Sequence, residues 1–131
     1  MKVLVVDDEL VSRKKMYKIM SQFSECESAE SGNIAMSLFE RAQELDVPYD
    51  LMTLDIEMPE INGIDVLKRI RLSEQKKKIA KNNQIRILIV TSHSDKDRVK
   101  KCIDAGCDNY IVKPFDKDLV ILKLQQLNFC I

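Results

Sequence analysis

The sequence has no excess of either charge, no long hydrophobic run and no signal-peptide core. Its 131 residues include 21 Lys and Arg against 21 Asp and Glu, so the formal net charge is zero. This balance gives no electrostatic support for direct nucleic-acid binding. No apolar run is long enough to cross a membrane, and MKVLVV (1–6) is followed at once by acids. We therefore expect a cytoplasmic protein that binds neither nucleic acid nor membrane.

The four cysteines lack the spacing of a metal site. They stand at positions 26, 102, 107 and 130, and no two of them form a CxxC pattern. Free thiols in a reducing compartment account for them better than a disulfide framework. The chain also lacks an internal repeat and a linker, so we expect one domain spanning residues 1–131.

Short apolar segments alternate with amphipathic helical patterns along the whole chain. Each segment is followed by a helical pattern, and the strands are predicted at residues 3–6, 26–30, 51–54, 85–90 and 110–112. Because parallel strands need crossover helices, this order predicts an α/β fold, a five-stranded parallel sheet with helices on both faces. The polar second strand is expected near a sheet edge. Residues 72–84 either extend the third helix or form a loop.

Local signals predict where some helices begin and which side chains they bury. Asn33 is a candidate N-cap of the second helix, and Ser94 or Asp95 is a candidate N-cap of the fourth. Gly106 is expected to end the fourth helix. The inward-facing residues of the fourth helix are predicted to be Val99, Cys102 and Ile103.

Acidic residues end two of the predicted strands. Asp7 and Asp8 follow the first strand, and Asp55 follows the third. Because ligands of an open α/β sheet bind at the carboxyl ends of its strands, the three carboxylates are expected to converge at one edge. Three anions repel one another unless a cation joins them, and such oxygen ligands suit Mg²⁺. The sequence therefore predicts a magnesium site at this edge.

A hydroxyl and a lysine end two further strands. Thr91 directly follows the fourth predicted strand and Lys113 the fifth, so both belong at the same edge as the acids. Taken singly, Thr91 could satisfy a local backbone group, Lys113 could be a surface charge, and Asp7 or Asp8 could only cap a helix. Five suitable groups at the ends of four buried strands favour a shared site.

These residues, in this order, resemble the receiver domain of two-component response regulators, of the chemotaxis-receiver type. The matching motifs are the Asp7-Asp8 pair, the D-x-x-M-P-x-x-x-G run that starts at Asp55, Thr91, and the Lys113-Pro114-Phe115 sequence. The resemblance covers essentially the whole chain. It implies a flavodoxin-like sheet with strand order 2-1-3-4-5.

The resemblance also implies a role for each residue at the site. Asp55 is expected to be the phosphoacceptor, whose carboxylate attacks a phosphoryl group. Asp8, Asp55 and the backbone carbonyl of Glu57 are expected to bind Mg²⁺ directly, while Asp7 acts through water. Lys113 is expected to pair with one phosphoryl oxygen, and Thr91 is expected to donate its hydroxyl to another.

Thr91 and Tyr110 are the expected switch residues. Once the Thr91 hydroxyl donates to a phosphoryl oxygen, space would open for the Tyr110 ring to turn inward. The switched surface would be formed by the fourth helix, the fifth strand and the fifth helix. Tyr110 could equally be a half-buried strand aromatic with no switching role.

The implied function is a signalling module rather than an enzyme acting on other molecules, with only autocatalytic phosphoryl transfer and self-dephosphorylation. Expected partners are a histidine kinase or phosphotransfer protein, and a downstream protein target or output domain. The apolar run LVILKL (119–124) exceeds the needs of one buried stripe. This surplus indicates a phosphorylation-dependent homodimer, or else a tail that packs more deeply because of residues 72–84. The Lys113–Pro114 peptide bond is expected to be cis.

Two other classes of protein are the alternatives. A small phosphohydrolase of the haloacid-dehalogenase class also uses an aspartate nucleophile, but it carries a second aspartate where Glu57 stands here. A flavin-binding flavodoxin-like protein needs a phosphate loop rich in Gly and hydroxyl groups, whereas DDELVSR (7–13) is acidic. Glu57 adds an acid beside Asp55, with an effect on dephosphorylation of undetermined sign. His93, the only histidine, is expected to be a solvated loop residue.

Overall fold

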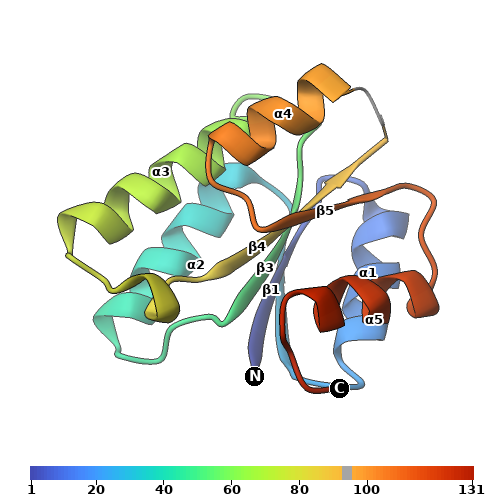
Figure 1. The fold of residues 1–131 in the computed structure, drawn as a ribbon, viewed down its shortest axis with the longest axis horizontal. Helices are drawn as coiled ribbons and strands as arrows, with labels where there is room; N and C mark the ends of the chain where they lie inside the picture. Colours follow the sequence, from blue (N-terminus) through green and yellow to red (C-terminus); the bar gives the residue numbers. More distant parts are fainter. Residues whose placement is uncertain (93–95) are drawn as a thin grey trace.

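A parallel five-stranded sheet forms the centre of the molecule in the computed structural model, which describes residues 1–92 and 96–131 (Figure 1). The strand order is β2-β1-β3-β4-β5, so the predicted α/β class and the 2-1-3-4-5 order are confirmed. The strands are β1 (Lys2–Val6), β2 (Glu25–Ala29), β3 (Leu51–Asp55), β4 (Arg86–Thr91) and β5 (Asn109–Val112).

Helices cover both faces of this sheet, as Figure 1 shows. The helices α2, α3 and α4 lie on one face, and α1 and α5 lie on the other. Their bounds are α1 (Leu10–Met20), α2 (Gly32–Glu44), α3 (Gly63–Lys76), α4 (Lys96–Asp104) and α5 (Lys117–Gln126). Within the described residues, no helix combines the length and the apolar character needed to cross a lipid bilayer.

The strand sequences explain their places in the sheet. The central strands β1, β3 and β4 are almost wholly buried, as their continuous apolar sequences require when helices cover both faces. The polar strand β2 pairs only with β1 and lies at the sheet edge, which confirms its predicted place. Buried central strands fix the register, and the register in turn aligns the strand ends that carry the candidate site residues.

The predicted cap of α2 is wrong by two residues. The Ser31 hydroxyl, and not Asn33, accepts the hydrogen bond from the Ile34 backbone N–H, at 3.2 Å. The helix therefore begins at Gly32, whose missing side chain lets the helix approach Ile61 of the loop before α3. Any Cβ at that position would collide with the Ile61 side chain.

The predicted inner face of α4 is also partly wrong. Cys102 is buried and Val99 is half-buried, but Ile103 is 57% exposed. Successive helical residues point about 100° apart, so a nine-residue helix that buries Cys102 turns Ile103 outward. The helix ends at Asp104, just before Gly106, which has a φ of 105°. The two predicted caps, Ser94 and Asp95, lie outside the described residues.

The connection at 72–84 combines both predicted possibilities. Helix α3 continues to Lys76, and a short 3₁₀ helix follows at Lys81–Asn83. In α5 the apolar surplus is smaller than its sequence indicates, because Val120 and Leu124 are buried against the sheet. Leu122, at 48%, is the most exposed apolar residue of the run.

Candidate functional site

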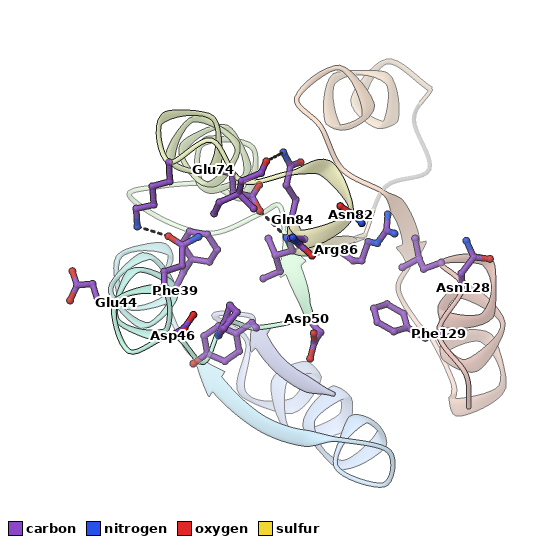
Figure 2. A pocket seen from close by; sticks show the side chains of 18 residues that line it. Phe39, Glu44, Asp46, Asp50, Glu74, Asn82, Gln84, Arg86, Asn128 and Phe129 are labelled. Carbon is purple, nitrogen blue, oxygen red and sulfur yellow. Dashed lines mark hydrogen bonds between the residues drawn. The ribbon is translucent and has the colours of Figure 1, made fainter.

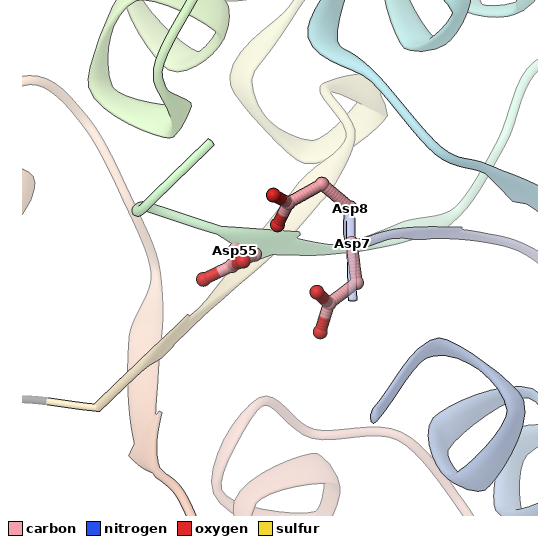
Figure 3. Close-up of side chains that lie close together, drawn as sticks. All are labelled: Asp7, Asp8 and Asp55. Carbon is pink, nitrogen blue, oxygen red and sulfur yellow. The ribbon is translucent and has the colours of Figure 1, made fainter. Parts of the chain in front are cut away.

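Three carboxylates meet at the carboxyl edge of the sheet, as Figure 3 shows. Oxygen atoms of Asp7, Asp8 and Asp55 all lie within 4.8 Å of one another. Asp7 and Asp55 are 4% and 2% exposed, whereas Asp8 is exposed to solvent. The structure therefore brings together the three acids that the sequence placed at this edge, in a shallow site with one open side.

The sheet register and a close helix approach position these acids. Val6 of β1 lies opposite Leu54 of β3, so Asp7 and Asp55 are the next pair along the two strands. Helix α3 begins at Gly63, beside the Asp55 backbone, and donates its N–H to the Ile56 carbonyl at 3.0 Å. A side chain at Gly63 would strike the Asp55 carbonyl, so this glycine permits the close approach that frames the acid.

Lys113 reaches into the acidic cluster from β5. Its Nζ lies 3.1 Å from Asp7 Oδ2 and 3.7 Å from Asp55 Oδ2. The Lys113 backbone N–H donates to the Thr91 carbonyl at 2.7 Å, which ties the end of β5 to the end of β4. The Lys113–Pro114 peptide bond is cis, as the sequence predicted.

The electrostatics of the site leave negative charge in excess. Burial of the Asp55 carboxyl, reinforced by the negative charge of Asp7, raises the pKa of Asp55 to about 8 despite the opposing charge of Lys113. Burial favours a neutral amine at Lys113, but the carboxylates of Asp55 and Asp7 outweigh it and raise the lysine pKa above its usual range. One ammonium group thus serves three carboxylates, and the site has the electrostatics of a cation-binding centre.

The donor set fits a divalent cation of the magnesium type. Asp7, Asp8 and Asp55 offer hard oxygen ligands around one point, and the open side next to Asp8 leaves room for retained waters. The backbone of Glu57 is anchored nearby, because its N–H donates to Asp55 Oδ1 at 3.3 Å.

Thr91, the last residue of β4, is 1% exposed and does not stand alone at this edge. Its hydroxyl donates to Glu57 Oε1 at 3.1 Å, and the Ser92 N–H lies 3.4 Å from Glu57 Oε2. The Arg98 guanidinium of α4 donates to the same Glu57 Oε1 at 2.9 Å. The sequence analysis missed Arg98, because an arginine on a helix surface carries no local signal of such a contact.

Tyr110 of β5 is half-buried and packs against the α2–α3 side of the core. The Lys123 ammonium of α5 lies 4.8 Å from the centroid of its ring, a cation–π contact that the sequence analysis also missed. A lysine inside an apolar helical run was its only sequence signal. His93 lies outside the described residues.

A second polar region lies at the opposite, amino edge of the sheet. A cavity of about 850 Å³ opens there between α2, the connection after α3 and the C-terminal tail, as Figure 2 shows. Glu74 at its wall is 1% exposed and accepts hydrogen bonds from Arg71 Nη1 and the Ile85 N–H, at 2.7 and 2.8 Å. Arg71 also pairs with Asp108 at 2.8 Å. Here each buried charge has a close partner, and the geometry describes a structural clamp.

Comparison with protein families and curated proteins identifies relatives over nearly the whole chain. The family model of the response regulator receiver domain matches residues 3–125. Chemotaxis protein CheY1 of Helicobacter pylori is 33% identical over 129 residues, which cover 95% of this chain and 94% of that protein. A cyclic di-GMP phosphodiesterase of Thermotoga maritima is 35% identical over 126 residues. That match covers 95% of this chain but 30% of the phosphodiesterase, so the chain spans about a third of that relative's length.

Solved structures also match nearly the whole chain. The CheX–CheY–BeF₃–Mg²⁺ complex from Borrelia burgdorferi matches with a TM-score of 0.82 and 26% identity, over 99% of this chain and 90% of that chain. CheY4 of Vibrio cholerae matches with a TM-score of 0.81 and 25% identity, over 96% of this chain and 97% of that chain.

Proposed function

The chain belongs to the response regulator receiver domain family, a family of two-component signalling modules, and from that premise we propose that it is regulated by phosphorylation of Asp55. The phosphoryl donor would be a histidine kinase, a phosphotransfer protein or a small phosphodonor. Residues 1–131 would act as one receiver domain. The observation that carries the proposal is the Asp55 carboxylate, buried between Asp7 and Lys113 at the open edge of the sheet.

The proposed reaction is an in-line displacement at phosphorus. An Asp55 carboxylate oxygen attacks the phosphoryl group of a phosphohistidine, a new O–P bond forms, and the N–P bond breaks. The bonding electron pair returns to the imidazole nitrogen, which takes up a proton. Lys113 Nζ, already 3.7 Å from Asp55 Oδ2, pairs with one oxygen of the transferred group and stabilises its charge.

Magnesium would neutralise the repulsion between the acids and the anionic donor. Asp8, Asp55 and the Glu57 backbone carbonyl would bind it directly, and Asp7 would act through a water molecule. Asp7 is suited to this outer role because its side chain already accepts from the Glu9 N–H at 2.9 Å and pairs with Lys113.

The output would be a change of the surface formed by α4, β5 and α5. The Thr91 hydroxyl would donate to a phosphoryl oxygen, and the Tyr110 ring would turn inward into the space that Thr91 leaves. The new surface would bind a downstream protein target or output domain, or a second copy of this chain. Leu122 and Ile103 are the exposed apolar residues on α5 and α4 that favour such a contact.

Self-dephosphorylation would end the signal. Water attacks phosphorus, the bond between phosphorus and the Asp55 oxygen breaks, inorganic phosphate and a proton are released, and the carboxylate is restored. The phosphohydrolase alternative requires a free general acid two residues after the nucleophile. Glu57 occupies that place, but its carboxylate accepts from Thr91 and pairs with Arg98. We therefore favour a signalling module that cleaves only its own aspartyl phosphate.

Intact-protein mass spectrometry after incubation with acetyl phosphate and Mg²⁺ tests the proposal. The parent protein and an Asp118→Asn variant, which changes an exposed acid of α5, should gain one phosphoryl group. Asp55→Asn should gain none, and Asp8→Asn should react much more slowly because it retains the nucleophile but loses a metal ligand. A phosphoryl group on Asp55→Asn would contradict the assignment.

A further inference from the structure

Glu57 connects three segments that are separate in the sequence but meet at the candidate site. It follows β3 by two residues, and its carboxylate accepts from the Thr91 hydroxyl of β4 and from Arg98 of α4. Its Oε2 also lies 3.4 Å from the Ser92 N–H, at the start of the segment between β4 and α4. One carboxylate therefore binds Thr91 and the helix that follows it.

We propose that Glu57 and Arg98 form a latch that holds Thr91 in its resting position, and that Arg98 is a positioning residue that acts through Glu57. The inference rests on the proposed phosphorylation of Asp55 and describes how the same site would be regulated. The latch consists of the Glu57 carboxylate and its contacts to Thr91 and Arg98.

The Thr91 hydroxyl limits which acceptors this residue can bind. A threonine hydroxyl has one proton to donate, so Thr91 cannot donate to Glu57 and to a phosphoryl oxygen on Asp55 at the same time. Phosphorylation must therefore break the 3.1 Å contact between Thr91 Oγ1 and Glu57 Oε1. Because Thr91 is 1% exposed, water cannot easily replace the lost acceptor during the exchange.

Arg98 determines where the Glu57 carboxylate lies. Its guanidinium donates to Oε1, the same oxygen that accepts from Thr91, at 2.9 Å. Charge-assisted hydrogen bonds of this kind are shorter and stronger than neutral ones, and they orient the carboxylate. Both side chains are about one-third exposed, at 33% for Glu57 and 37% for Arg98. Solvent therefore weakens the ion pair, which favours the resting position of Thr91 but still allows Thr91 to leave it.

The latch should lower the apparent affinity of the protein for a phosphoryl mimic. If only molecules without the Thr91–Glu57 hydrogen bond can accept the phosphoryl group, the apparent affinity is reduced in proportion to their fraction. Weakening the latch should increase the affinity for beryllofluoride in the presence of Mg²⁺. Arg98→Met also removes one positive charge, which makes the surroundings more repulsive to this anion and opposes the gain. The control must therefore remove one positive charge from the same helix.

Arg98→Met and Lys100→Met provide that matched comparison, because Lys100 is an exposed lysine on α4. We expect Arg98→Met to bind beryllofluoride about threefold more tightly than Lys100→Met, as suits a part-exposed ion pair. Arg98→Lys, which keeps a cation for Glu57, should lie close to the parent. Equal affinities for Arg98→Met and Lys100→Met would overturn the latch.

A second readout needs neither metal nor phosphoryl mimic. In the metal-free protein, the Thr91 methyl and Ser92 amide resonances should shift in Arg98→Met and in Glu57→Ala, while Lys100→Met leaves them unchanged. In the parent, the same resonances should shift in the same direction on addition of Mg²⁺ and beryllofluoride. Resonances in Arg98→Met that coincide with those of the parent would refute the positioning role.

The two readouts separate the latch from the proposed function. A parent protein that binds no beryllofluoride would refute the proposed function, whereas the Thr91 resonance of metal-free Arg98→Met would still test the latch. A parent that binds beryllofluoride, combined with unshifted Thr91 resonances in Arg98→Met, would refute the latch alone.

Discussion

The two ends of the sheet each carry a cluster of charges, and the clusters differ in how those charges are balanced. At the carboxyl edge, three carboxylates meet one ammonium group, and burial raises the pKa of Asp55 to about 8. At the amino edge, Arg71 donates to Glu74, to Asp108 and to the carbonyls of Ile85 and Gly106.

This difference separates a structural cluster from the candidate functional site. In the Arg71–Glu74–Asp108 clamp every charge has a partner, because Arg86 lies 3.8 Å from Asp108 as a second cation, and the clamp joins α3, the start of β4 and the turn before β5. The acids at the carboxyl edge remain short of positive charge until a cation or a proton arrives. Removing a carboxylate should therefore destabilise the fold at the amino edge and stabilise it at the carboxyl edge.

The largest expected effect is at Glu74. Glu74→Ala should lower the free energy of unfolding by about 3–5 kcal/mol, because it leaves the Arg71 guanidinium and the Ile85 N–H without their buried acceptor. Urea denaturation measures the change, with Glu40→Ala as an exposed control expected to stay within about 0.5 kcal/mol. A loss at Glu74 no larger than the control would show that the clamp is not structural.

The opposite sign is expected at Asp55. Asp55→Asn should raise the free energy of unfolding of the metal-free protein at pH 7.5 by about 1–3 kcal/mol, because it removes a carboxylate that burial and Asp7 disfavour. The open side of the site screens part of the full effect. Urea denaturation in EDTA should show this gain. A loss of stability would show that the Asp55 carboxylate is already balanced by positive charge in the metal-free protein.

The acids at the carboxyl edge were predictable, whereas the clamp was not. Asp7, Asp8, Asp55, Thr91 and Lys113 are at strand ends, and parallel strands bring their carboxyl ends to one edge whatever the details of packing. The sequence analysis named all five, and the structure places all five at that edge.

The clamp and the latch depend on contacts between helices and loops. Arg71, Glu74 and Asp108 come from two distant segments, and the sequence analysis treated the region around the first of them only as the end of a helix or a loop at residues 72–84. Arg98 reaches Glu57 over 41 positions, through a side chain whose direction is set by how α4 packs. No periodic pattern encodes such contacts.

A pH titration of stability sharpens the comparison. The folded-state pKa of Asp55 is raised from 3.8 to about 8, so the unfolded chain releases this proton first as pH rises. The parent should therefore lose stability relative to Asp55→Asn between about pH 4 and pH 8, by about 1–2 kcal/mol from pH 5 to pH 7.5. Added Mg²⁺ should reduce this loss, because the cation favours the ionised carboxylate. A stability difference between the parent and Asp55→Asn that does not change with pH would contradict the raised pKa of Asp55.

The smallest expected effect tests how far the clamp extends. Arg86 Nη1 lies 3.8 Å from Asp108 Oδ1, and the Arg86 side chain is 37% exposed. This ion pair is therefore longer and more exposed to solvent than the contacts of Arg71. Arg86→Met should lower the free energy of unfolding by about 0.5 kcal/mol or less, because the aliphatic stem is retained and an exposed ion pair contributes little. Arg71→Met, measured in the same urea series, should cost several times more. If the two variants were equally destabilised, burial and hydrogen-bond number would not be what distinguishes the clamp from an ordinary surface pair.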